Sequence, residues 1–214
     1  MTERAIVNRL REEYFGLLPG VRRIVDRLET EIRFHTRHIQ QSLKPYEQLI
    51  VKSRIKECPS ALETAQRKGN MGKGEGKVFD PERPGDYSVL SLPDLAGVRV
   101  LVFPDRRLTR VDEVLRKQFQ GWRSDPITDS KGSFLAHKYY GRLLPESEAL
   151  AEYQVVPMLL GLYWEVEHSA RYKSDLKGSS RMSELNAKVE SALSDFERGI
   201  ADLLPDDSDL DSGA

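Results

Sequence analysis

The chain has 214 residues, of which 39% are hydrophobic and 31% are charged. This hydrophobic content is enough for a buried core and excludes a disordered or fibrous protein. The 33 basic and 34 acidic side chains give a net charge of -1, so the composition provides no general attraction to nucleic acid or to an anionic membrane. Four aspartates lie within residues 205–214, and we expect this segment to form a disordered acidic tail.

Cysteine content and hydropathy indicate the compartment. The single cysteine, Cys58, excludes an internal disulfide framework and a multi-cysteine zinc site. No base stands beside it in the sequence, which favours a structural role over a nucleophilic one. No apolar run approaches the ~20 residues that a membrane span requires, and the N-terminus lacks the apolar core of a signal peptide. We therefore expect a cytoplasmic protein that does not contact a membrane.

The first predicted element is an amphipathic helix over about 20–42, beginning after a break at Pro19-Gly20. Its second face is basic, and we interpret this face as solvated rather than as a phosphate-binding surface. His35 and His38 lack the four-residue spacing of a shared helical metal site, so we interpret both as structural.

Short β-rich runs follow, and helical segments separate them. The predicted strands are Leu49–Lys56, Gly97–Phe103, Ser133–Tyr140 and Ala151–Val156, and the predicted helices cover about 60–68, 107–119 and 158–173. Residues 69–93 are rich in Gly, Lys and Pro and predict a mobile basic loop. This loop is not a P-loop, because Met71 and Val78 occupy positions that require Gly and Ser or Thr.

A second long helix is predicted near the C-terminus. Its apolar stripe runs from Met182 to Leu203, with Ser179 and Ser180 as candidate caps. Such a stripe can pack on the domain or on another subunit. Taken together, the elements predict an α+β fold in which helices pack against a mixed sheet.

The first candidate binding element is the strand before the first short helix. Lys52, Arg54 and Lys56 alternate along it, so the three cations share one face of the strand. The strand leads into a helix start at Pro59-Ser60. Fixed cations and the backbone N–H groups of a helix N-terminus are what a triphosphate requires.

Two carboxylates are candidates for chemistry. Asp94 precedes one strand, and Glu152 lies on another. They could hold Mg²⁺ together, or one could bind the metal while the other polarises an attacking hydroxyl. Taken alone, carboxylates at strand ends are more often solvated than catalytic.

The order of the motifs is more specific than any one of them. Arg54-x-Lys56-x-x-x-Ser60 is followed by Asp94-x-x-Gly-x-Arg99, then by Glu152-x-Gln154, and then by Glu167-His168 and Tyr172-Lys173. Over about residues 44–174, this series resembles the synthetase domain of the RelA/SpoT family, the small alarmone synthetases in particular. The resemblance implies a nucleotidyltransferase-like core with helices over 1–43 before it, a helix over 175–204 after it, and the tail.

The resemblance also implies an activity, which is the transfer of the β,γ-diphosphate of ATP to the 3'-hydroxyl of GDP or GTP. It implies that Arg54 and Arg99 sandwich the adenine and that Lys56 and Ser60 hold the ATP phosphates. Asp94 would bind Mg²⁺, and Glu152 would activate the acceptor hydroxyl or share the metal. Gln154 and His168 would line the acceptor side.

The chain departs from the family pattern mainly on the acceptor side. Family members carry Gly-Tyr-x-Ser-x-His, where this chain has Ser133 at the Tyr position and Leu135 at the Ser position. Val156-Pro157 replaces the usual Arg-Thr, and Thr64 replaces a common Lys. Phe134, Tyr139 and Tyr140 are candidates for stacking on the guanine. Because side chains alternate along a strand, we expect His137 and Tyr139 to face the acceptor and Tyr140 to point away.

Two alternatives follow from the better match on the donor side. Toxic relatives pyrophosphorylate the 3'-CCA end of tRNA. In this chain the basic first helix, with Lys73 and Lys77, could contact tRNA phosphates. Such a protein would have an antitoxin partner. A degenerate fold could instead serve as a binding module, but Asp94 and Glu152 argue against it. No His is followed by Asp, so the hydrolase domain of long family members is not expected. We place a guanine nucleotide first as acceptor, and expect a homo-oligomer formed through the terminal helices.

Overall fold

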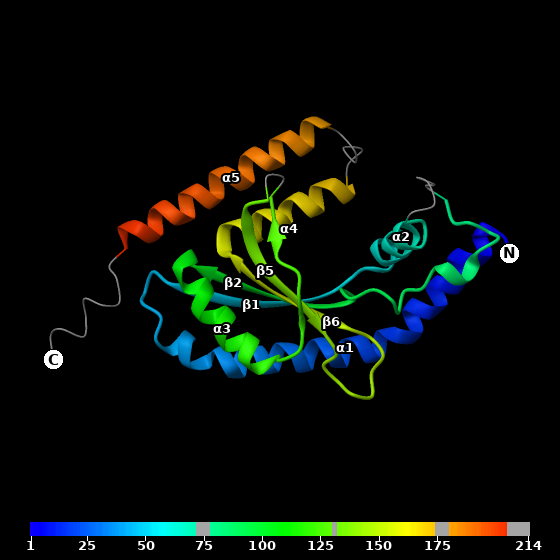
Figure 1. Ribbon diagram of the computed structural model, residues 1–214, viewed down its shortest axis with the longest axis horizontal. Coiled ribbons are helices and arrows are strands. Elements are labelled where there is room, and N and C mark those ends of the chain that lie inside the picture. The colour runs from blue at the N-terminus through cyan, green and yellow to red at the C-terminus, as the bar shows by residue number, and fades with distance from the viewer. Residues whose placement is uncertain (72–77, 130–131, 174–179, 205–214) are drawn as a thin grey trace.

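The computed structural model describes residues 1–71, 78–129, 132–173 and 180–204 (Figure 1). The helices are α1 (Glu3–Gln41), α2 (Cys58–Gly69), α3 (Leu108–Gln118), α4 (Met158–Lys173) and α5 (Ser180–Leu203), with short 3-10 helices η1 (Pro84–Asp86) and η2 (Asp105–Arg107). The strands are β1 (Gln48–Ile55), β2 (Ala96–Phe103), β3 (Arg123–Ser124), β4 (Ile127–Thr128), β5 (Phe134–Gly141) and β6 (Ala151–Pro157).

The strands form one mixed sheet. Their order is β1-β2-β6-β5-β3, and β4 pairs with β5 outside this path. The pair β2 and β6 is parallel, whereas β1 with β2 and β5 with β6 are antiparallel. The two central strands are almost entirely buried, as expected for strands covered on both faces. The mixed sheet with flanking helices confirms the predicted α+β class.

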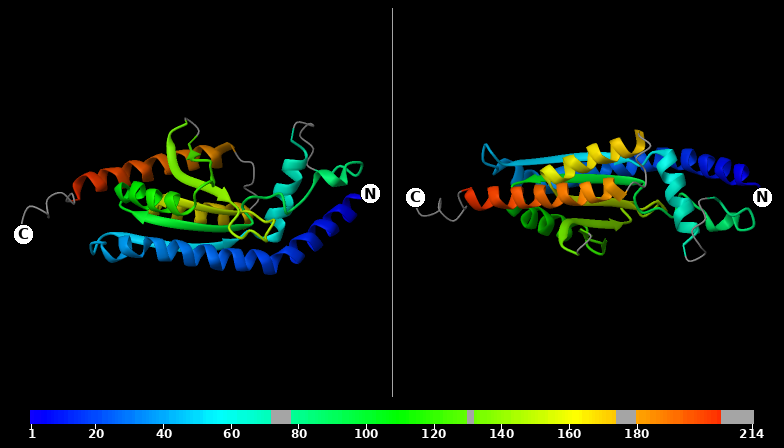
Figure 2. Two further views of the ribbon diagram at one scale, coloured as in Figure 1. Left: turned by 60° about the horizontal axis from the view of Figure 1, so that its bottom comes forward. Right: turned by 90° about the horizontal axis from the view of Figure 1, so that it is seen from above.

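Helices cover the two faces of the sheet differently. Figure 2 shows α1 and α5 on opposite sides of the sheet; α3 packs with α1, and α4 packs with α5. The side chains toward α1 and α3 are mostly apolar and include Val98, Val100, Tyr153 and Val155, all buried in the main core. Because side chains alternate along a strand, the polar residues of the same strands point toward α4. The site is on that second face.

Helix α1 is a single element that runs through Pro19, so the predicted break at Pro19-Gly20 is wrong. Thr2 caps its start by accepting a hydrogen bond from the backbone N–H of Ala5. The buried stripe continues on both sides of the proline, from Ile6 to Ile39. Its burial offsets the cost of an interior proline, about 3 kcal/mol, and the helix bends along its length (Figure 2).

The predicted basic loop divides into two parts. Residues 72–77, including Lys73 and Lys77, lie outside the described residues. In contrast, residues 78–93 form a packed connection in which Phe79, Tyr87, Val89 and Leu92 are buried. The prediction of a mobile loop is therefore wrong for this second part, because its apolar side chains reach the core beside α1.

The C-terminal helix α5 lies against α4 (Figure 1). The acidic tail, residues 205–214, lies outside the described residues. In the described ranges, no helix has the combined length and hydrophobicity that crossing a membrane requires.

Candidate functional site

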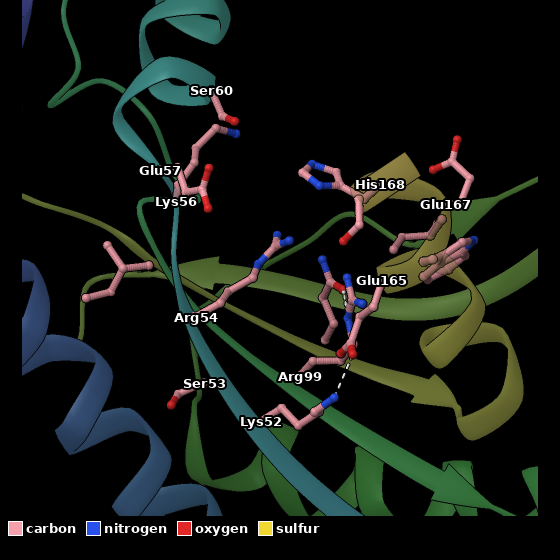
Figure 3. A pocket seen from close by; sticks show the side chains of 15 residues that line it. Lys52, Ser53, Arg54, Lys56, Glu57, Ser60, Arg99, Glu165, Glu167 and His168 are labelled. Carbon is pink, nitrogen blue, oxygen red and sulfur yellow. Dashed lines mark hydrogen bonds and ion pairs between the residues drawn. The ribbon is translucent and has the colours of Figure 1, made fainter. Parts of the chain in front are cut away.

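A cavity of about 560 Å³ opens on the polar face of the sheet, between β1, the start of α2 and α4 (Figure 3). Lys52, Arg54 and Lys56 follow one another along its β1 side, as their alternation predicted. Arg99 enters from the neighbouring strand β2. Four cationic side chains therefore line one cavity, which makes it suited to a polyanion.

Each cation on β1 is held by a carboxylate from another element. Lys52 Nζ lies 2.6 Å from Glu165 Oε2 on α4. Arg54 Nη2 lies 3.3 Å from Glu152 Oε1 on β6, and Lys56 Nζ lies 2.5 Å from Asp94 Oδ2. The three ion pairs direct the cations along the cavity.

A glycine in the second motif permits one of these pairs. The strand register places Gly97 between Arg54 and Glu152. A Cβ atom on Gly97 would lie 3.1 Å from Arg54 Nε and 3.2 Å from Arg54 Cγ. Because glycine leaves this space open, the Arg54 side chain crosses β2 and reaches the carboxylate on the next strand.

Arg99 occupies the adjacent cross-strand row. Its Nε donates to Gln154 Oε1 at 3.0 Å, and its Nη1 donates to the Gly161 carbonyl of α4 at 3.3 Å. The guanidinium carbon lies 5.7 Å from the centre of the Trp164 ring. Burial, and then the nearby Arg54 charge, lower the pKa of Arg99 to about 10. Arg99 stays charged at neutral pH, in surroundings that favour an anion or an aromatic face.

Glu152 is almost completely buried, with 5% of its surface exposed. Its Oε1 accepts hydrogen bonds from Gln154 Nε2 at 2.7 Å and from Arg54 Nη2. Burial raises the pKa of Glu152, Arg54 opposes this effect, and the charge of Asp94 adds to it. A carboxylate with a raised pKa is a better proton acceptor than an exposed one.

Asp94 precedes β2 and presents an unsatisfied oxygen. Its Oδ2 binds Lys56, while its Oδ1 is buried without a hydrogen-bond partner among the described residues. Carboxylate oxygens are preferred Mg²⁺ ligands, and Mg²⁺ often takes only one or two from the protein, with substrate phosphates completing the set. No group of three or more His, Cys, Asp or Glu side chains suited to a metal occurs within the described ranges. Asp94 and the nearby Glu152 therefore fit a metal shared with a phosphate substrate.

The start of α2 closes another side of the cavity. Ser60 lies in its first turn, is buried, and lines the cavity. The first backbone N–H groups of a helix have no partner within the helix and favour anions. Across the cavity, His168 on α4 is exposed and also lines it. The side chains of Tyr172 and Lys173 lie outside the described part of the structure.

The structure does not bring His137 and Tyr139 to the cavity. In the register of β5, Tyr139 pairs with Tyr153 and His137 pairs with Val155, so both point to the face opposite Glu152. Tyr139 is buried, and its hydroxyl donates to Asp112 Oδ1 at 2.8 Å. The expectation that these two residues face the acceptor and that Tyr140 points away is wrong.

Sequence reasoning did not name Lys138, and it named Tyr140 only as a candidate for stacking that was expected to point away from the acceptor. They pair with Gln154 and Glu152, which places them on the same face of the sheet as these two polar residues. Lys138 Nζ lies 2.8 Å from Asp125 Oδ2, and the Tyr140 hydroxyl also contacts this carboxylate. Alternation shows that Lys138 and Tyr140 share one face of β5. The pairing register of β5 with β6 was needed to show that this is the face of Glu152 and Gln154.

Comparison of the sequence with known proteins finds no matching family model and no matching curated protein. Among solved structures, small alarmone synthetase 1 from Bacillus subtilis bound to its product pppGpp has a TM-score of 0.64 at 18% identity, covering 90% of this chain and 96% of that chain. Small alarmone synthetase 2 from the same organism has a TM-score of 0.60 at 17% identity, with coverages of 89% and 97%.

A GTP pyrophosphokinase family protein from Streptococcus pneumoniae has a TM-score of 0.56 at 19% identity, covering 92% of this chain and 91% of that chain. At these identities, the similarity establishes the fold. The chain has the fold of the small alarmone synthetases, as the resemblance of its motif order implied.

Proposed function

We propose that this protein is an ATP-dependent diphosphotransferase that moves the β,γ-diphosphate of ATP to the 3'-hydroxyl of a guanine nucleotide. The observation that carries the proposal is the cavity in which Lys52, Arg54, Lys56 and Arg99 meet the N-terminus of α2. Asp94 and Glu152 are paired with two of these cations. The similarity of the fold to small alarmone synthetases supports the same activity.

The donor half of the cavity suits ATP. Arg54 and Arg99 provide two guanidinium planes on neighbouring strands, which suits stacking on an adenine. Lys56, Ser60 and the first amides of α2 would hold the phosphates. Phosphoryl-type transfer depends on charge neutralisation and positioning more than on covalent chemistry by the protein.

Asp94 would hold Mg²⁺ together with the substrate phosphates, and the metal when bound would neutralise phosphate charge and polarise the transferred group. Lys56 orients the Asp94 carboxylate through their ion pair and leaves Oδ1 available. In the reaction, the 3'-oxygen of the acceptor forms a bond to the β-phosphorus of ATP. The bond from this phosphorus to the oxygen that bridges to the α-phosphorus breaks, and AMP leaves. The hydroxyl proton passes to the Glu152 carboxylate.

The acceptor would bind on the β5 side of Glu152. Gln154, Lys138 and Tyr140 share this face of the sheet, and His168 faces the cavity from α4 (Figure 3). Lys138 supplies a charge for the acceptor phosphates, and Tyr140 supplies a ring for its base.

The test is incubation with γ-labelled ATP and separate pools of GDP, GTP, ATP and tRNA. We expect label in GDP and GTP, with one AMP released for each label transferred. Label only in tRNA would replace the guanine nucleotide with the tRNA end as acceptor. If ATP binds and no pool is labelled, the protein is a binding module and the proposal fails.

The same assay tests the two carboxylates. Asp94→Asn and Glu152→Gln should each lower the transfer rate by about 10²- to 10³-fold, because each removes a charge required near the reacting phosphates. The melting temperature should change little. Asp195→Asn is the matched control, since this side chain is 70% exposed on α5. Normal turnover in either site variant would contradict the assignment.

A further inference from the structure

Helix α4 is capped by a residue that comes from another helix. It begins directly after Pro157, the last residue of β6, and proline has no side-chain oxygen to serve as a cap. Glu197 of α5 is fully buried, and its Oε1 accepts a hydrogen bond from the Leu159 backbone N–H at 2.9 Å. Its Oε2 is buried and has no hydrogen-bond partner among the described residues. Glu197 thus serves the N-terminus of α4 as an N-cap would.

The helix that Glu197 caps forms a wall of the cavity. Trp164, Glu165, Glu167 and His168 of α4 line it (Figure 3). The carbonyl of Gly161, within the same helix, accepts a hydrogen bond from Arg99. The position of α4 therefore sets the surroundings of the cationic row.

Two more side chains of α5 bind this wall. Glu190 Oε1 accepts from Trp164 Nε1 at 2.9 Å. Asn186 Nδ2 donates to Glu167 Oε1 at 2.7 Å, and its Oδ1 accepts from the Tyr163 hydroxyl at 2.7 Å. Figure 1 shows α5 lying along α4. Together with Glu197, these residues attach α5 to α4 at three places along its length.

We propose that Glu197 is a positioning residue, whose carboxyl group accepts from the first turn of α4 and so holds the cavity wall in its binding position. The identification of ATP as the ligand of that wall rests on the proposed function. The anchoring itself rests on the contacts between α5 and α4.

The charge of this carboxylate changes near neutral pH. Burial raises the pKa of Glu197 to about 7; Asp105 of η2 adds to this effect, and the amides of α4 oppose it. Arg106 of η2 donates to the Leu204 carbonyl at 3.1 Å and approaches Glu47.

Stability should follow the same titration. The folded-state pKa lies above the ordinary value of 4.5, so between these values the folded protein binds more protons than the unfolded chain. The free energy of unfolding therefore falls as pH rises from about 4.5 to 7 through this group. An opening of α4 that exposes the Glu197 carboxylate to water follows the same linkage, so ionisation does not strengthen the attachment of α4.

The test compares wild type with Glu197→Ala, which removes the acceptor, and with Glu197→Gln, which keeps an acceptor oxygen. Amide hydrogen exchange in the first turn of α4 is measured without nucleotide, and the affinity for a non-hydrolysable ATP analogue is measured at the same pH. We expect exchange in Glu197→Ala to be about tenfold faster and analogue affinity to be several-fold weaker, because the Leu159 N–H loses its acceptor. Glu197→Gln should restore most of both.

Glu184→Ala is the matched control, since Glu184 is exposed on the same helix, and it should match wild type in both measurements. Wild-type exchange in Glu197→Ala, or exchange in Glu197→Gln as fast as in Glu197→Ala, would overturn the proposal. Failure of wild type to bind the analogue would reject the proposed function, while the exchange measurement still decides the anchoring.

Discussion

At the scale of single residues, the cavity depends on the lack of a side chain at Gly97 as well as on its charged side chains. Arg54 reaches Glu152 because Gly97 leaves the space between them open. The same spacing places Arg54 and Arg99 close enough for one to lower the pKa of the other. The glycine of the second motif thus determines where a cation of the first motif lies.

Gly97→Ala tests this dependence. The new Cβ would lie 3.1 Å from Arg54 Nε, and the Arg54 side chain, 46% exposed, can move away by a few tenths of an ångström. We expect little change in melting temperature and an ATP affinity about fivefold weaker, because a displaced guanidinium loses about 1 kcal/mol of stacking. Gly85→Ala is the control, since a Cβ there meets nothing within 4 Å. If titration gives Gly97→Ala the same ATP affinity as wild type, Arg54 does not need the space that Gly97 leaves open.

The two neighbouring tyrosines of β5 should behave differently on substitution. Tyr139→Phe removes the donor to the buried Asp112, which we expect to cost about 1 to 3 kcal/mol of unfolding free energy with little effect on transfer. Tyr140→Ala should reduce acceptor use by roughly ten- to a hundredfold, the value of one base-aromatic stack, while ATP affinity is kept. Denaturant unfolding and acceptor saturation curves measure the two effects. The reverse pattern would contradict the assigned faces.

At the scale of elements, the first half of α1 supports the segment that leads to Asp94. Glu13 Oε1 accepts from Ser88 Oγ at 2.6 Å and from the Leu90 N–H at 2.9 Å. Arg9 Nη2 donates to the carbonyls of Pro84 and Tyr87 at 2.7 Å and 2.8 Å. These bonds attach a connection with little regular structure to a long helix, shortly before the Asp94 carboxylate enters the site.

Glu13→Ala should loosen this connection. Its loss leaves the Ser88 hydroxyl and the Leu90 amide without their acceptor, and we expect the free energy of unfolding to fall by about 1 to 3 kcal/mol. The transfer rate should also fall, because Asp94 is less firmly placed. Hydrogen exchange over residues 84–95 and the labelled-ATP assay check both effects. Glu12→Ala changes an exposed neighbour and should leave both unchanged; equal exchange in the two variants would argue against the support.

At the scale of the whole molecule, α4 and α5 present apolar side chains to the outside. Val166 is 67% exposed on α4, and Leu185, Phe196 and Leu203 of α5 are 54%, 54% and 85% exposed. Part of the stripe predicted from the sequence therefore packs against the domain, and part of it faces outward. Exposed apolar groups on neighbouring helices favour association, and we propose a second copy of this chain as the partner.

Light scattering tests this association. We expect wild type at micromolar concentration to have a multiple of the monomer mass, and Phe196→Asp to shift the population toward monomer, because a charge would be buried in the contact. Phe34→Asp is the control, since Phe34 is 68% exposed on α1, away from these helices. A wild-type monomer would reject the association and would give more weight to the alternative tRNA acceptor.

The sequence by itself determined most of the elements and the cations that line the cavity. The polar positions of β1, and the order of motifs from Arg54 to Gln154, are local patterns, because alternation along a strand and the start of a helix depend on neighbouring residues. The continuity of α1 through Pro19 was not visible in this way, since burial along its whole length outweighs the local preference of proline.

Only the tertiary structure decided which residues of β5 share the face of Glu152 and which residues form the far wall of the cavity. Periodicity shows that Tyr139 and Tyr140 point in opposite directions, but their faces follow from the pairing of β5 with β6. A register shift of one residue exchanges the two faces. The Trp164 wall and its anchor Glu197 depend on how α5 packs on α4, and such contacts between distant segments form only when the chain folds.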